Sequence, residues 1–136
     1  MKARAILTFL VLTVFVMAGT AQNKGVSAKI TDLKKVTTTV TSPSTSSSSS
    51  CNTSDFPVYQ GSTEKDIDFA DLTWISIRHD LTPSDPNYVS IELTFTDGTT
   101  GIYEMVKYIR FTGRTPEGSF SIMAKDVNTV EIVHPI

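Results

Sequence analysis

The amino-acid sequence predicts an all-β protein, a small sandwich or barrel of about ten short strands that follows an N-terminal signal peptide. Apolar side chains recur at every second position through most of the chain, as they do in strands that bury one face. Turn residues separate these stretches, and no long stretch repeats its apolar residues at the helical period. A sequence pattern that occurs twice further indicates two similar five-strand halves.

Residues 1–21 have the three parts of a cleavable secretory signal peptide. Lys2 and Arg4 form a basic start, residues 5–18 are apolar, and small residues lead to a cleavage site after Ala21. The apolar stretch is shorter than the roughly 20 residues of a membrane-spanning helix, and no later segment is as long. We therefore expect residues 22–136 to form a single β domain that is secreted, periplasmic or at the cell surface, with no transmembrane segment.

Charge and cysteine content narrow the classes of partner and of fold. The 136-residue chain has a formal net charge of −2, and its basic residues are dispersed. Nucleic-acid binding requires a concentrated positive surface, so we expect no nucleic-acid partner. The single cysteine, Cys51, cannot form a disulfide within the chain, and either stays free or cross-links two chains.

The clearest strand covers residues 89–96, where apolar and polar side chains alternate without interruption. Asp97-Gly98 follows directly and precedes a second alternating stretch that begins near Thr100. Asp-Gly between two β stretches is a strong signal for a tight hairpin, because the turn needs positive φ angles. Residues 80–87 contain two prolines and several turn formers, which predicts a connecting loop.

An internal repeat links the two parts of the chain. Residues 71–79 match residues 126–134 without a gap, in a pattern that begins with Asp, places apolar residues at fixed positions and ends with His. Looser matches pair residues 58–61 with 110–113 and residues 26–31 with 89–94.

The serine-rich segment interrupts the first copy of this repeat. We expect residues 42–55 to be a flexible loop or linker, because serines supply too little apolar surface to offset the entropy of ordering. An alternative is that residues 22–54 form a disordered stalk, but the alternating residues 36–41 have good strand propensity. Asn52 begins a glycosylation sequon, which matters only in a host that glycosylates exported proteins.

The two histidines are candidate metal ligands. The repeat places His79 and His134 at equivalent positions, each after the last strand of its copy. Related by a pseudo-twofold axis, the two side chains could bind a metal ion or share a proton. The alternative is two surface histidines at strand ends, because a zinc site usually has three or four protein ligands.

A group of aspartates is a second candidate site. Asp66 and Asp68 would share one face of a strand, and with Asp71 they could supply oxygen ligands to calcium. Asp71 has a repeat partner in Asp126, however, and an Asp before the same strand in both copies is typical of a turn or helix cap.

Trp74 is the leading candidate for ligand binding. It alternates out of phase with the apolar residues of its strand, so we expect it to point away from the core on the same side as Arg78. An exposed indole can stack on a sugar ring or anchor a protein interface, and Tyr59 could widen that surface. Alternatively, the serine-rich segment covers Trp74.

These observations favour an exported, non-catalytic binding or structural module whose partner is a protein or glycan at the cell surface. We expect no cofactor and no catalytic residue, since the chain lacks a Gly-x-Ser-x-Gly nucleophile motif. The alternative is a small secreted hydrolase or metal-dependent enzyme that uses His79, His134 and nearby carboxylates.

Overall fold

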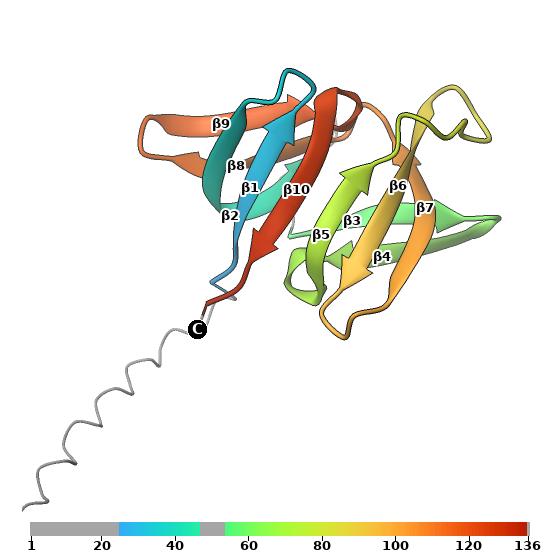
Figure 1. The fold of residues 1–136 in the computed structure, drawn as a ribbon, viewed down its shortest axis with the longest axis horizontal. Coiled ribbons are helices and arrows are strands. Elements are labelled where there is room, and N and C mark those ends of the chain that lie inside the picture. Colours follow the sequence, from blue (N-terminus) through green and yellow to red (C-terminus); the bar gives the residue numbers. More distant parts are fainter. Residues whose placement is uncertain (1–24, 47–53, 136) are drawn as a thin grey trace, which may run out of the picture.

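The computed structural model describes residues 25–46 and 54–135, and confirms an all-β protein with ten strands. All strand pairs are antiparallel and form a single curled sheet in the order β4-β3-β7-β6-β5-β10-β1-β2-β8-β9 (Figure 1). Among the described strands the sheet has two free ends, β4 and β9, so this part of the chain forms an open, curled half-barrel rather than a closed barrel or a sandwich of two sheets. The strands are β1 (Ser27–Asp32), β2 (Thr37–Ser46), β3 (Asp55–Gln60), β4 (Thr63–Asp68), β5 (Leu72–Ile77), β6 (Tyr88–Phe95), β7 (Thr100–Val106), β8 (Arg110–Thr115), β9 (Gly118–Met123) and β10 (Val127–Val133).

The sheet curls into two lobes that lie side by side (Figure 1). One lobe contains β3, β4, β5, β6 and β7, and the other contains β1, β2, β8, β9 and β10. The lobes meet in the middle of the sheet, where β5 pairs with β10 and Ile75 lies opposite Val130. No helix in the described part of the chain has the length and apolar character needed to span a membrane.

The repeat is visible in the strand order. Read from its two ends, the sheet runs β4-β3-β7-β6-β5 and β9-β8-β2-β1-β10, which is the same order when β1–β5 are matched to β6–β10. A short 3-10 helix precedes the last strand of each copy, η4 (Phe69–Asp71) and η5 (Ala124–Asp126). Each copy contributes strands to both lobes, so the two copies are exchanged rather than folded separately.

Hairpin registers correct one part of the predicted repeat. Phe56 pairs with Ile67 in the β3–β4 hairpin, and Phe111 pairs with Ile122 in the β8–β9 hairpin. These registers make Phe56 and Phe111 equivalent, so the expected match of residues 58–61 with 110–113 is displaced by part of a strand. The sequence match paired two glycines that are not equivalent, because Gly61 lies in the turn between β3 and β4 whereas Gly113 lies within β8.

The serine-rich segment is ordered further than expected, because β2 continues through Ser46. Ser44 pairs with Thr112 of β8, and the Thr45 side chain is buried, with its hydroxyl donating to the Asp55 carbonyl at 2.8 Å. The disordered-stalk alternative is therefore wrong for residues 25–46. Residues 47–53, with Cys51 and Asn52, and residues 1–21, the predicted signal peptide, lie outside the described residues.

One hydrophobic core joins both lobes. Its centre holds three buried phenylalanines, Phe56 and Phe69 from one lobe and Phe111 from the other. The ring centroid of Phe111 lies 6.0 Å from the ring centroid of Phe56 and 6.2 Å from that of Phe69, both in edge-to-face geometry. These contacts cross the boundary between the lobes, so the two lobes share their packing.

The predicted hairpin at Asp97-Gly98 is confirmed. Gly98 has a φ angle of 90°, which an L side chain rarely adopts. One carboxylate oxygen of Asp97 accepts hydrogen bonds from the Thr99 backbone N–H at 3.0 Å and its hydroxyl at 2.7 Å. These bonds lower the pKa of Asp97 and fix the turn that joins β6 to β7.

Candidate binding groove

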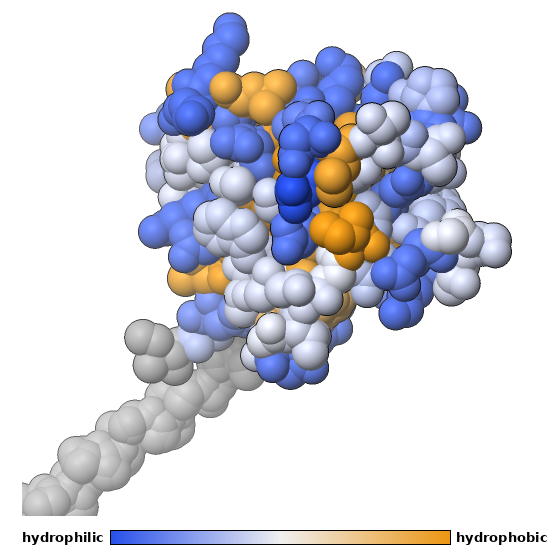
Figure 2. Space-filling model, turned by 45° about the vertical axis from the view of Figure 1, so that its right-hand side comes forward, coloured by the Kyte–Doolittle hydropathy of each residue, from blue (hydrophilic) through white to orange (hydrophobic). Residues whose placement is uncertain are grey.

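A groove of about 630 Å³ opens on the outer surface of the β3–β7 lobe. It lies between the connection that follows β5 and the turn that follows β3, and its size suits a small ligand or a segment of a larger one. Figure 2 shows the apolar side chains of the surface in separate patches among hydrophilic ones. The groove is lined by Tyr59, Gln60, Gly61, Leu81, Thr82, Ser84, Ser90, Ile102, Tyr103 and Glu104.

Two exposed aliphatic side chains give the groove its apolar surface. On β7, Met105 faces the core, whereas Ile102 lies in the opposite phase and is 43% exposed. Leu81, in the connection after β5, is 37% exposed. Both side chains are available for contact because no strand or loop of the described chain buries them.

Arg78 holds the start of the connecting loop. Its guanidinium forms two bonds to Asp80, at 2.9 and 2.8 Å, and a third to Glu92 of β6 at 2.9 Å. The hydrogen bonds with Asp80 raise the pKa of Arg78, and the same bonds lower the pKa of Asp80. A bidentate arginine–carboxylate pair is geometrically specific, so this fork fixes the path of the chain as it leaves β5.

Glu104 holds the middle of the same loop. Its two carboxylate oxygens accept one bond each from Ser84, at 2.9 Å from the backbone N–H and 2.7 Å from the hydroxyl. Further along, the Asn87 carbonyl accepts a bond from the Lys107 N–H at 3.0 Å. The loop is therefore tied to the sheet at several points, and one wall of the groove is pre-formed.

Tyr59 and Gln60 form the opposite wall. The Tyr59 ring packs against Tyr88 with centroids 5.3 Å apart, and Gln60 Nε2 donates to the Ile102 carbonyl at 3.2 Å. Partial burial raises the pKa of the Tyr59 hydroxyl, and the nearby Glu64 carboxylate raises it further. Tyr59 thus stays a neutral hydroxyl with a partly exposed ring.

The three predicted ligand-binding residues are separated by the structure. Tyr59 lines the groove, and Arg78 supports it through its two carboxylate partners. Trp74 is 39% exposed, as expected for a side chain that points away from the core, but lies between Thr94 and Glu131 on neighbouring strands. β5 and β3 are three strand spacings apart, about 14 Å, so Trp74 lies outside the groove.

The two histidines do not form a shared site. His79 Nε2 donates to the Val127 carbonyl at 2.9 Å, and His134 Nε2 donates to the Leu72 carbonyl at 2.7 Å. Leu72 begins β5 and His79 lies two residues beyond its end, and β5 spans roughly 20 Å, so the structure does not bring the two histidines together for a common metal ion or a shared proton. Each histidine instead bonds the first residue of the other copy's last strand, which locks β5 and β10 together.

The aspartate group does not gather into a calcium site either. Asp68 caps η4, because its carboxylate accepts the Ala70 N–H at 2.8 Å. The cap predicted for Asp71 thus belongs to Asp68, whereas the Asp71 backbone carbonyl accepts the Thr96 N–H at 3.0 Å. Within residues 25–46 and 54–135, no three His, Cys, Asp or Glu side chains lie close enough to hold a metal ion.

Fold and groove together define a small all-β protein with a pre-formed surface groove. Residues 22–134 match the model of a protein family that is described as an uncharacterised protein, and the chain belongs to this family. No curated protein sequence matches it.

Sequence reasoning missed the main groove residues, Leu81, Ile102 and Glu104. Ile102 carried a usable signal, because it is apolar and alternates out of phase with the buried Tyr103 and Met105. Leu81 carried none, since its position depends on how the loop folds back onto β7.

Proposed function

We propose that this protein is an exported, non-catalytic binding module that acts at the cell surface or in the extracytoplasmic space. Its binding surface is the groove on the β3–β7 lobe, and its partner is a protein or a glycan. The observation that carries this proposal is the pair of exposed aliphatic side chains, Leu81 and Ile102. They lie between two walls of the groove, and hydrogen bonds within the protein hold these walls in place.

Pre-formed walls favour binding because little conformational entropy is lost when a ligand enters. Arg78 and Glu104 fix the loop before any partner arrives. The groove combines apolar side chains, the Tyr59 ring and polar groups such as Thr82 and Ser90. Such a mixture is common in sites that recognise sugars or extended peptide segments.

A non-catalytic role is supported by the polar groups nearby. Glu104 accepts both of its Ser84 bonds as a loop anchor, and no histidine lines the groove to complete a nucleophile and base pair. His79 and His134 are both bonded to backbone carbonyls far from each other. These separate backbone bonds do not favour the hydrolase alternative, which relied on the two histidines together with nearby carboxylates.

Export is supported by the sequence of residues 1–21 and by the extent of the family match, which begins at residue 22. The segment shared within the family thus starts directly after the expected cleavage site. N-terminal sequencing of the protein recovered from its host tests this part of the proposal, and we expect it to begin at Gln22. A protein that retains Met1 would contradict it.

Recovery of partners from the native envelope and medium tests the binding surface. The exported protein carries an affinity tag, and the groove variant Ile102→Lys is compared with Val133→Lys as a matched control. Val133 is also an exposed aliphatic residue, on the outer face of β10 in the other lobe, and is 36% exposed. We expect a defined protein or glycan to be recovered with the wild type and the control, and to be lost with Ile102→Lys.

Trp74→Ala separates the groove from the rest of the sheet surface. Because Trp74 lies outside the groove, we expect this variant to retain the partner. Loss of the partner with Trp74→Ala, but not with Ile102→Lys, would refute the assignment of the groove.

A further inference from the structure

The two free ends of the sheet are equivalent in the repeat but differ in chemistry. β4 ends one lobe and β9 ends the other, each as the second strand of an equivalent hairpin. β4 carries three consecutive charged residues, Glu64, Lys65 and Asp66. Lys65 lies on the core side of β4 with Ile67, and its ammonium sits 5.8 Å from the Tyr103 ring centroid. An inward-facing charge on an edge strand is a known protection against pairing with another chain.

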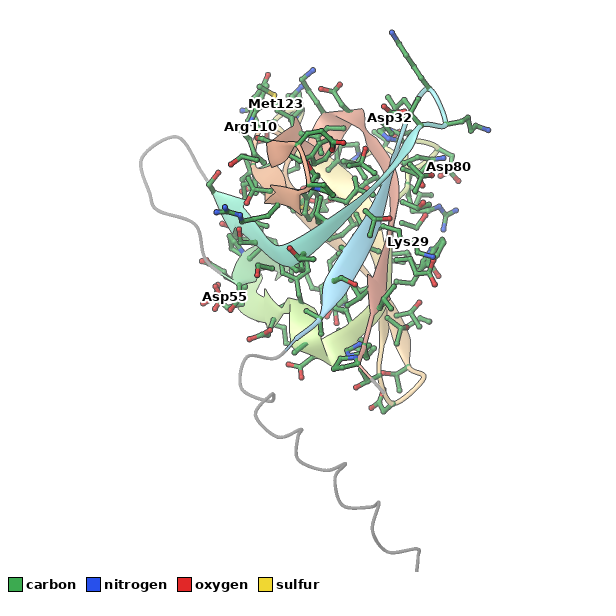
Figure 3. The ribbon with its side chains drawn as sticks, turned by 90° about the vertical axis from the view of Figure 1, so that its left-hand side faces the viewer. Lys29, Asp32, Asp55, Asp80, Arg110 and Met123 are labelled. Carbon is green, nitrogen blue, oxygen red and sulfur yellow. The ribbon has the colours of Figure 1, made fainter. Side chains whose placement is uncertain are left out.

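β9 has no such protection. The positions equivalent to the three charges of β4 are Ser119, Phe120 and Ser121, and no residue of β9 is charged. Phe120 and Ile122 pack on the core but remain partly exposed, because no strand within residues 25–46 and 54–135 covers the far side of β9. Figure 3 faces this end of the molecule, with the cross-strand pair Arg110 and Met123 labelled on β8 and β9.

We propose that β9 pairs antiparallel with β9 of a second copy of this chain, which forms a twofold-symmetric dimer with a continuous sheet. Unpaired strand edges supply backbone N–H and C=O groups for such pairing, and a twofold interface uses the same surface on both copies. The proposal concerns the opposite lobe from the groove and does not depend on the proposed function.

Side-chain alternation restricts the register of this pairing. The core-facing side chains must lie on the same face in both copies. A register centred on Ser121 satisfies this, because it places Phe120 of each copy opposite Ile122 of the second copy. Aromatic and β-branched residues opposite each other stabilise antiparallel pairs, and both side chains lose their remaining exposure.

Charge complementarity supports a second copy as the occupant. In the same register, the turn residue Glu117 of each copy faces the segment that follows β9 in the second copy, where Lys125 of η5 contacts Asp126 of its own chain at 3.3 Å and has a further acid within reach in Glu117. The side chains of Glu117 and Lys125 are exposed, and the twofold axis forms the ion pair between them twice. Pairing of β9 with a second copy's β4 would instead bring Lys65 into line with Phe120, which removes an ammonium from water without a matching acid on β9.

Sedimentation velocity of the exported protein tests the dimer. A reducing agent is present, so that Cys51 cannot cross-link two chains. We expect the wild type to dimerise with increasing concentration and Phe120→Lys, which transfers the β4 protection to β9, to remain monomeric. The matched control is Thr63→Lys, which adds the same charge to β4 and leaves the dimer unchanged.

A charge exchange at two exposed residues limits folding defects, and Glu117→Lys is the cleaner single variant because Lys125→Glu also removes the exposed ion pair with Asp126. Glu117→Lys or Lys125→Glu alone should raise the dimer dissociation constant about tenfold, and the double variant should restore it. Circular dichroism confirms that each variant is folded. A wild type that stays monomeric up to its solubility limit would overturn the proposal, as would a dimer that Phe120→Lys and the single charge reversals leave unchanged.

Discussion

Phe111→Ala should destabilise both lobes together. Phe111 is 1% exposed and packs edge-to-face on Phe56 and Phe69 of the other lobe. Removal of a buried phenylalanine side chain costs about 3–5 kcal/mol, and the lost aromatic contacts favour the upper part of that range. Since domains of this kind are stable by about 5–15 kcal/mol, the variant loses a large share of its free energy of unfolding.

Urea denaturation measures this loss. With a slope of about 1.5 kcal/mol per molar, a loss of about 4 kcal/mol lowers the midpoint by about 3 M. Far-UV circular dichroism follows the strands, and the fluorescence of Trp74 follows β5 in the middle of the sheet. We expect the two signals to change together, because the core is shared. The reasoning would be refuted if Phe111→Ala lowered the urea midpoint by less than about 1 M and by no more than the control Phe95→Ala, which removes a partly buried side chain. Two separate transitions would refute it as well.

Three further changes test other parts of the fold. Gly113→Ala places a methyl group 2.5 Å from both Cβ and Cγ2 of Val40, so we expect a loss of about 1–3 kcal/mol in the free energy of unfolding, measured by denaturation. Adding Val40→Ala should not restore stability, because an alanine keeps the clashing Cβ and the buried methyl groups of Val40 are lost. The hydrogen bonds from Arg78 lower the pKa of Asp80 in the folded protein. Their contribution to stability is therefore complete above the pKa of an unfolded aspartate, about 4, and is lost as the pH falls through the lower pKa of the folded protein. Denaturation between neutral and acidic pH should show this loss in the wild type and not in Arg78→Gln. A circular permutant opened within residues 47–53, with its original ends joined by a short linker, should give the wild-type circular-dichroism spectrum. Gly25 lies beside Pro135, so the linker can be short, and the strands of each lobe become contiguous in sequence. An unfolded permutant would contradict the strand order.

Local patterns predicted the elements that depend on neighbours in sequence. Alternation in residues 89–96 identified β6, and Asp97-Gly98 identified its hairpin, because strand burial and turn geometry are set within a few residues. The match of residues 71–79 with 126–134 identified two equivalent strands, β5 and β10.

Features that depend on distant residues could not be predicted in the same way. Sequence similarity between the copies does not specify which copy supplies the neighbour of each strand, so the exchange of strands between lobes was missed. Serine supplies little apolar surface, yet β2 continues to Ser46 because β8 pairs with it and the Thr45 hydroxyl donates to a backbone carbonyl. The histidines have separate roles because each bonds a carbonyl on the other copy's strand.

The groove could not be predicted from the sequence, because one of its walls depends on how the loop after β5 folds back onto the sheet. Glu104 and Ser84 are distant in sequence, and their two hydrogen bonds place the loop over β7. No local pattern reports such a contact. The exposed Ile102 was nevertheless readable from its phase on the strand, whereas Trp74, the most conspicuous residue in the sequence, lies elsewhere on the sheet.

Photocrosslinking in intact cells of the native host tests the binding groove most directly. A photoreactive amino acid replaces Ile102 in the groove in one strain, and Val133 on the outer face of the other lobe in a second strain. We predict a discrete adduct of defined mass from position 102 and none from position 133 after illumination. No adduct at position 102, or the same adducts from both positions, would contradict the claim that the groove is where this protein binds its partner.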